Sequence, residues 1–186
     1  MLNDLVLKNR SYRRFDESCV ITEETLRELC ALARITPSGA NRQFFKFRLT
    51  PTGEECEKVF STLAWAGYLK DGAPPVGERP TGYITIVNDD TLGKGNVMDV
   101  GIMAQTILLG AVEKGLGGCM LGSIKRKELK EILGLNEDYE IMLVIALGKP
   151  IEKVVIEDAK DGDIKYWRDE ERVHHVPKRP IGELII

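Results

Sequence analysis

The sequence predicts an α+β fold, in which several amphipathic helices accompany only a few strands. Helical spacing of apolar residues recurs along the chain, whereas strand patterns are rarer and do not alternate strictly with the helices. Strict alternation would be expected of a doubly wound parallel sheet. At 186 residues, the chain is expected to form one domain, residues 1–186, with a single substantial core.

Composition and charge narrow the class of protein. Hydrophobic residues make up 43% of the chain and charged residues 30%, which is typical of a soluble globular protein. The formal net charge of -3 argues against nucleic acid as the main partner. No apolar run is long enough for a membrane helix, and the N-terminus lacks the pattern of a signal peptide. We therefore expect a cytoplasmic protein with no nucleic acid and no membrane as partner.

Cysteine and histidine do not form a metal-binding pattern. The four cysteines are scattered without a C-x-x-C pair, and His174 and His175 are adjacent in a polar stretch. Neither arrangement matches the ligand spacing of a zinc site. We expect no metal, reduced and mostly buried thiols, and solvated histidines.

The first helices are predicted by spacing and capping residues. A short helix is expected over residues 2–9. Thr22 is suited to cap a second helix, which Pro37 ends. The apolar positions of this second helix share one face, at Leu26, Leu29, Cys30 and Ala33.

Alternation of apolar and polar residues over 45–50 predicts a half-buried strand. Thr52 and Glu55 then predict a capping box that opens a third helix. Two prolines and two glycines make residues 72–77 a loop, and residues 83–87 read as a strand.

The second half begins with the longest apolar helix, over residues 97–114, whose broad apolar stripe predicts a central and largely enclosed position. A glycine-rich run, 115–122, and a short charged helix, 125–133, follow. The continuous apolar run 141–147 predicts a strand covered on both faces. After Pro150 the chain reads as polar and irregular.

The basic segment Arg10-Ser11-Tyr12-Arg13 is the first stretch that could carry chemistry. If it continues as a turn of helix, the guanidinium groups of Arg10 and Arg13 lie on one side. Two arginines and a hydroxyl could then hold a phosphate. The alternative is a solvated basic turn, which is common on protein surfaces.

Residues 37–43 form the second such stretch. Ser38 and Asn41 offer side-chain donors and acceptors, and Gly39 permits close approach of the backbone. This set could grip the edge of a polar heterocycle. An ordinary turn from helix to strand explains the same residues.

The glycine-rich run is the third stretch. A dinucleotide fingerprint G-x-G-x-x-G would need glycine where Met120 stands, and it should follow a strand rather than a long helix. A Rossmann site is therefore excluded. The run could present backbone N–H groups to a flat ligand, or it could be a tight crossing from helix to strand.

Taken together, these stretches resemble the FMN-dependent nitroreductase family over nearly the whole chain. Asp99 and Gln105 in the long helix, Gly148-Lys149-Pro150 after the last core strand and Pro177-Lys178-Arg179 near the end complete the match. The resemblance implies a central, mainly antiparallel sheet flanked by helices. It also implies an intertwined homodimer with one FMN in each of two clefts at the subunit interface.

The resemblance assigns the cofactor contacts by position. Arg10, Ser11 and Arg13 would hold the FMN phosphate, with Lys178 or Arg179 nearby. Leu121 and Gly122 would pass over one face of the ring, with a backbone N–H near N5. The ribityl chain and ring edge would be lined, from the partner subunit, by Pro37, Ser38, Gly39, Asn41 and Gln43.

The implied reaction is a ping-pong transfer of hydride from NADH or NADPH, through flavin N5, to a small oxidised acceptor such as a nitroaromatic or a quinone. It needs no catalytic side chain. The segment 64–79 would cap the cleft, and its Trp65 and Tyr68 would stack on flavin or substrate, or else pack in the core or the dimer interface. Two alternatives stay open: a flavin enzyme with another reaction, such as reductive dehalogenation or flavin destruction, and a non-enzymatic flavin-binding or dimeric interaction protein.

Overall fold

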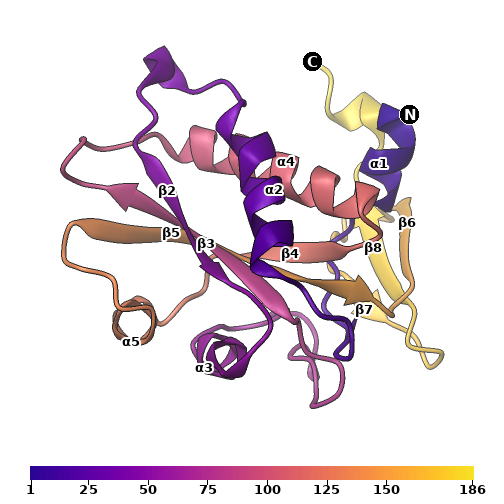
Figure 1. The fold of residues 1–186 in the computed structure, drawn as a ribbon. Helices are drawn as coiled ribbons and strands as arrows, with labels where there is room; N and C mark the ends of the chain where they lie inside the picture. The colour runs from indigo at the N-terminus through magenta and orange to yellow at the C-terminus, as the bar shows by residue number, and fades with distance from the viewer.

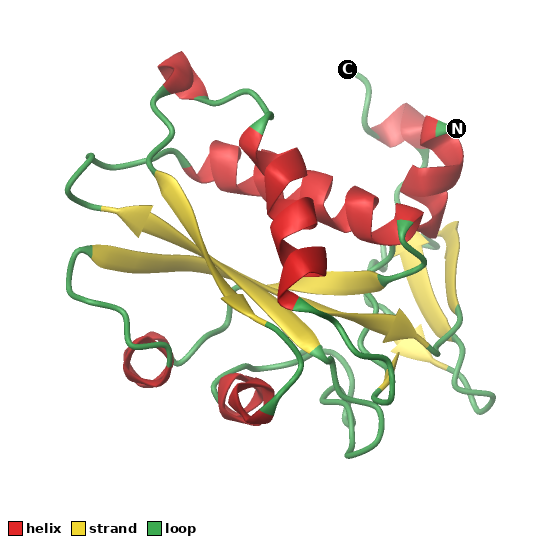
Figure 2. Cartoon of the chain, in the orientation of Figure 1, coloured by secondary structure: helices red, strands yellow, loops and turns green.

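The computed structural model describes residues 1–186 and contains an antiparallel sheet between two layers of helices (Figure 1; Figure 2). The predicted α+β class is confirmed. The helices are α1 (Leu2–Lys8), α2 (Glu23–Arg34), α3 (Glu54–Ser61), α4 (Val97–Glu113) and α5 (Arg126–Ile132), with 3-10 turns η1 (Gly39–Asn41) and η2 (Ile181–Glu183). The strands are β1 (Phe15–Asp16), β2 (Phe45–Thr50), β3 (Gly82–Asp89), β4 (Gly117–Leu121), β5 (Tyr139–Pro150), β6 (Val154–Asp158), β7 (Trp167–Arg168) and β8 (His174–Lys178).

The long strand β5 organises the main sheet. It pairs with β3 along most of its length, with β4 over residues 144–148, and with β1 at Lys149 and Pro150. β2 extends the sheet by pairing with β3, so the order is β1-β5-β3-β2 with β4 on β5. All these pairings are antiparallel. The strand predicted from the apolar run 141–147, covered on both faces, is thus confirmed.

Each face of the sheet has its own core, because successive strand residues point to opposite sides. α2 and α4 cover one face, where Ile84, Ile86, Ile145 and Leu147 are buried. α3 and α5 lie on the other face, as Figure 2 shows, over a core that includes Tyr83, Val144, Ala146 and Leu129.

α4 is enclosed on one side only. Ala104, Ile107 and Ala111 are fully buried against the sheet and α2. Met98 and Ile102, on another side, are 67% and 40% exposed, so the prediction of a largely enclosed helix is only half right. None of the helices has the length and apolar character needed to cross a membrane.

The prediction that the chain is irregular after Pro150 is wrong. β6, β8 and β7 form a second, three-stranded sheet, in which β6 runs parallel to β8 and β7 antiparallel to it. The apolar run in β6, 154–156, is shorter than the run of about four residues that marks a strand, and β7 and β8 carry few large apolar residues.

The helix caps agree with the sequence at α2 and not at α3. The Thr22 side chain accepts from the N–H of Thr25 at 3.1 Å, as predicted. Thr52, expected to cap α3, instead accepts from the N–H of Ile21 (2.8 Å) and donates to the carbonyl of Thr81 (2.7 Å). Gly53 occupies the N-cap without a side-chain bond. The prediction of a capping box is therefore wrong, because the Thr52 hydroxyl forms tertiary hydrogen bonds instead.

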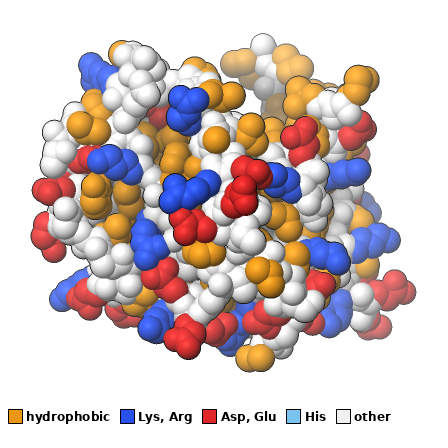
Figure 3. All heavy atoms as spheres, in the orientation of Figure 1, with side chains coloured by type: hydrophobic (Ala, Val, Ile, Leu, Met, Phe, Trp, Pro, Cys, Tyr) orange, Lys and Arg blue, Asp and Glu red, His pale blue; other side chains and the backbone are white.

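Charges of both signs are interspersed on the face in Figure 3, with no patch of one sign. Several exposed apolar side chains lie at the two termini, which are near each other in Figure 1. They include Leu2, Leu7, Ile181, Leu184 and Ile185.

Candidate flavin site

The segment Arg10–Arg13 runs beside β4 and does not continue α1 as a helical turn. Ser11 forms a parallel bridge with Gly118, and Tyr12 donates its N–H to the carbonyl of Gly118 at 3.0 Å. The helical turn that would place Arg10 and Arg13 on one side is absent, since pairing with β4 holds the segment extended. The same pairing brings the basic segment Arg10–Arg13 next to the glycine-rich run 115–122.

Glycine at 117 and 118 makes this pairing possible. A Cβ on Gly118 would lie 2.0 Å from the carbonyl oxygen of Ala146 on β5, and one on Gly117 would lie 2.6 Å from the Tyr12 ring. Both residues are buried. At Gly117 and Gly118, therefore, the interpretation of the glycine-rich run as a tight crossing from helix to strand fits the structure better than its interpretation as a source of exposed N–H groups.

The guanidinium groups of Arg10 and Arg13 retain unused donors. Arg10 donates through Nη2 to the carbonyl of Val6 (2.8 Å), and Arg13 through Nη1 to that of Ser11 (3.2 Å). The Nε of each is enclosed and has no hydrogen-bond partner. Enclosed, unpaired Nε atoms also occur at Arg14, Arg79 and Arg168, but those side chains form ion pairs. Arg10 and Arg13 form none, and they therefore suit a ligand that supplies acceptors.

Residues 37–43 form a tight turn after α2, tied to the start of α4. The N–H of Gly39 donates to both carboxylate oxygens of Asp99, at 3.1 and 3.2 Å. Asn41 and Gln43 have positive φ, and the Gln43 amide donates to Asn41. The hydroxyl of Ser38 is enclosed without a partner. Asp99 is thus a positioning residue that the sequence indicated only through the resemblance.

Within one chain, the two stretches lie at opposite ends of α4. Gly39 is held at the first turn of this helix, whereas Arg10–Arg13 pairs with the strand that follows its last turn (Figure 1). The helix has 17 residues and is therefore about 25 Å long. One protomer does not bring the two stretches together.

Leu121 and Gly122 leave the sheet at the end of β4. Leu121 is 5% exposed and belongs to the core, whereas Gly122 is exposed and a Cβ there would meet no atom within 4 Å. Arg126 donates to the carbonyl of Gly122 at 3.3 Å, which ties this segment to α5. The open backbone is therefore confined to the end of the glycine-rich run.

Lys178 and Arg179 are exposed residues at the end of β8. Arg179 forms an ion pair with Glu183 at 3.2 Å. Neither side chain forms a hydrogen bond with the segment Arg10–Arg13 in this structure.

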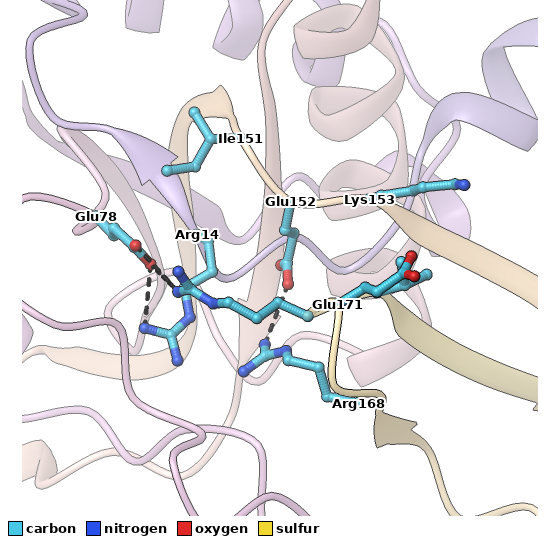
Figure 4. A pocket seen from close by; sticks show the side chains of 9 residues that line it. Arg14, Glu78, Ile151, Glu152, Lys153, Arg168 and Glu171 are labelled. Carbon is cyan, nitrogen blue, oxygen red and sulfur yellow. Dashed lines mark hydrogen bonds and ion pairs between the residues drawn. The ribbon is translucent and has the colours of Figure 1, made fainter.

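A charged pocket of about 340 Å³, which sequence reasoning missed, is lined by Arg14, the residue that follows the Arg10–Arg13 segment (Figure 4). The side chains of Arg14, Arg168 and Glu152 are 5%, 7% and 3% exposed. Arg14 pairs with Glu78 (3.3 Å), and Arg168 pairs with Glu152 (3.1 Å). These side chains neutralise one another in ion pairs, so we interpret the pocket as part of a structural network of charges. Nothing in the sequence indicates these pairings, because their partners are distant along the chain.

The two histidines are packed, so the prediction of solvated histidines is wrong. His174 is 1% exposed, and burial, with Arg13 and Arg168 nearby, lowers its pKa to about 4. His175 stacks on Trp167 at 4.0 Å and lies between Glu157 (3.2 Å) and Asp169 (3.1 Å). The hydrogen bond to Asp169 is the main cause of its raised pKa.

The two aromatic residues of the segment 64–79 have different surroundings. Trp65 packs on Phe60, with ring centres 5.5 Å apart, at the edge of the core beneath the sheet. Tyr68 is 58% exposed, and its ring lies 4.9 Å from that of Tyr166. Within the chain, therefore, Trp65 packs at the core, while Tyr68 contacts the C-terminal region.

Comparisons with known proteins agree with this geometry. Residues 76–149 match the model of the nitroreductase family. A provisionally named NADH dehydrogenase/NAD(P)H nitroreductase of Archaeoglobus fulgidus is 25% identical over 165 residues, covering 84% of this chain and 90% of the relative.

Solved structures share the fold. A nitroreductase family protein from Streptococcus pneumoniae TIGR4 aligns with a TM-score of 0.72 at 14% identity, over 100% of this chain and 99% of that one. An FMN-dependent nitroreductase from Clostridium difficile R20291 aligns with a TM-score of 0.63 at 20% identity, over 87% and 92%. The family model over residues 76–149, the relative aligned along most of the chain and the common fold together support assigning the chain to the nitroreductase family.

Proposed function

We propose that the chain is an FMN-dependent oxidoreductase that passes hydride from NADH or NADPH to a small oxidised acceptor, such as a nitroaromatic or a quinone, by a ping-pong scheme. The observation that carries this proposal is the set of enclosed, unpaired polar atoms at Arg10 Nε, Arg13 Nε and Ser38 Oγ. These three atoms belong to residues that the family resemblance assigns to the cofactor. They fit a ligand that brings phosphate and hydroxyl oxygens.

In this proposal, Arg10, Ser11 and Arg13 bind the phosphate of FMN, with Lys178 or Arg179 adding positive charge. Leu121 and Gly122 offer backbone N–H groups to one face of the ring. Bound FMN supplies the hydride chemistry itself, so no catalytic side chain and no metal are required. The chain orients the cofactor and excludes competing reactions, with residues 1–186 acting as one FMN-binding domain.

The proposal includes a homodimer. Pro37, Ser38, Gly39, Asn41 and Gln43 would reach the cofactor of the partner subunit, since α4 separates them from Arg10–Arg13 in their own chain. The exposed apolar residues of α1, α4 and the C-terminus are suited to an interface. The names of the Archaeoglobus and Clostridium relatives support a nicotinamide donor and FMN, respectively. The cytoplasmic location stays a prediction.

The test is a visible spectrum of the protein after FMN has been added and unbound FMN removed by desalting. We expect a retained flavin band that NADH or NADPH bleaches without oxygen. Arg10→Ala should weaken FMN binding about 10- to 100-fold, the effect of losing a charge-assisted hydrogen bond. Lys127→Ala, which removes an exposed cation of α5, should not.

Loss of all flavin from the wild-type protein would contradict the proposal. Retention without bleaching by either nicotinamide would favour the non-enzymatic alternative. Retention and bleaching without turnover of any nitroaromatic or quinone would favour another flavin reaction.

A further inference from the structure

The side chain of Arg13 differs from those of Arg14, Arg168 and Arg172 because it has no carboxylate partner. Arg14, Arg168 and Arg172 form ion pairs with Glu78 or Glu152, at distances of 2.9 to 3.3 Å. Arg13 donates from its side chain only to the carbonyl of Ser11, and its Nε is enclosed without a partner. Its positive charge is therefore free to meet an anionic ligand.

An aromatic ring takes the place of the missing carboxylate. The guanidinium carbon of Arg13 lies 5.3 Å from the centre of the Tyr166 ring, within the range of a cation–π interaction. This contact orders the flat guanidinium group without neutralising it. Tyr166 comes from the segment just before β7, far from Arg13 in sequence.

The Tyr166 ring is itself held from two sides. Tyr68, in the segment 64–79, packs on it with ring centres 4.9 Å apart and planes at 55°. His174, on β8, meets it edge to face at 5.4 Å and 68°. His174 is 1% exposed and anchored in the second sheet, so the position of the Tyr166 ring is fixed by two separate elements.

We propose that Tyr166, supported by Tyr68 and His174, is a positioning residue that holds the Arg13 side chain in place for the phosphate of FMN. The inference rests on the proposed function, which makes Arg13 a phosphate contact. An arginine that is already ordered loses less side-chain freedom when it binds, so more of its interaction with the phosphate appears as affinity. The second sheet and the segment 64–79 thereby contribute to cofactor selection without touching FMN.

Titration with FMN and with riboflavin, followed by the quenching of flavin fluorescence, tests this role. Riboflavin lacks the phosphate, so the ratio of the two affinities reports the phosphate contacts alone. We expect Tyr166→Leu to lower FMN affinity about 3- to 30-fold, the worth of a cation–π contact, and to leave riboflavin affinity within about twofold. Tyr166→Phe, which keeps the ring, should retain the wild-type ratio.

A parallel loss of both affinities would show a merely structural role and overturn the inference, as would an unchanged FMN affinity. If Tyr166→Leu does not fold, Tyr68→Leu is the variant to measure, because Tyr68 is exposed. Its loss should still lower the ratio of FMN affinity to riboflavin affinity, and an unchanged ratio would overturn the inference. The proposed function fails differently: wild-type protein would then bind no flavin, or would bind FMN and riboflavin alike, and the inference would fall with it.

Discussion

Glu152 carries a buried carboxylate in the pocket of Figure 4, where it pairs with Arg168. Its carboxylate accepts from Arg168 Nη2 at 3.1 Å and from the N–H of Arg13. Because the side chains of Glu152 and Arg168 are 3% and 7% exposed, removing the Glu152 charge takes from Arg168 its enclosed partner and leaves only Asp71, at 3.4 Å and 71% exposed. We expect Glu152→Gln to lower the free energy of unfolding by about 3 kcal/mol, measured by urea denaturation.

Glu171→Gln is the matched control, since Glu171 lines the same pocket but is exposed and forms no ion pair. Its free energy of unfolding should stay within about 0.5 kcal/mol of the wild type. Equal effects of the two substitutions would show that the pocket's net charge matters and that the buried pair does not.

His175 makes stability depend on pH. Its pKa is raised, mainly by the hydrogen bond to Asp169 and further by Glu157, so the folded chain holds this proton more tightly than the unfolded chain. The stabilisation is complete below the unfolded value, about 6.5, and is lost as pH rises through the raised folded value. The gap in Tm between wild type and His175→Gln should therefore be larger at pH 6 than at pH 9.

The choice of pH 6 also keeps the acidic partner charged. The pKa of Asp169 is lowered, chiefly by His175, so its share of the stabilisation disappears only as pH falls well into the acid range. A Tm gap that is the same at both pH values would mean that the imidazole contributes by stacking on Trp167 rather than by its charge.

At the scale of elements, α3 lacks the side-chain N-cap that the sequence predicted. Gly53 at its N-cap has extended backbone, and a Cβ there would lie no closer than 4.0 Å to another atom. Gly53→Ser should therefore supply the missing side-chain acceptor without strain. Gly53→Ala changes the backbone entropy alone, so the serine variant should exceed it by about 1 kcal/mol in free energy of unfolding. Equal stability in urea denaturation would indicate that the cap does not form.

Helices and core strands were predictable where the evidence is local. The apolar spacing of α2 and the uninterrupted run in β5 reflect burial against the sheet and the helices, so the pattern and the structure have one cause. The second sheet was not predictable, because β6 pairs with β8 about 20 residues away, β6 has an apolar run of only three residues and β8 has none. The extended form of Arg10–Arg13 likewise depends on Gly118, which lies on a distant strand.

The candidate site divides in the same way, into residues that the sequence indicates and contacts that depend on distant segments. Its residues, and Asp99 among their supports, could be named from a resemblance, but the contacts that the supports make could not. Asp99 holds Gly39, and Tyr166 lies under Arg13, through contacts between segments far apart in the sequence. Single positions in the motif indicate which groups meet a ligand, whereas the packing that orients them appears only in the folded chain.

At the scale of the whole molecule, the exposed side of α4 offers the sharpest test of the proposed dimer. Ile102 and Met98 are 40% and 67% exposed on a helix whose other side is core, and Gly101 between them leaves open space. A partner subunit seated there would bury these residues. We expect wild-type protein to sediment as a dimer, and Ile102→Glu to sediment as a monomer, because a charge is costly in an apolar interface.

The same variant separates assembly from cofactor binding. If the site takes residues 37–43 from one subunit and Arg10–Arg13 from the other, Ile102→Glu should lose FMN in proportion to its loss of dimer. Thr106→Glu, placed one turn further along α4, gives a measure of how far the interface extends. A monomeric Ile102→Glu that still retains FMN on desalting would mean that one chain is sufficient to hold the cofactor, and the division of the site between two subunits would have to be abandoned.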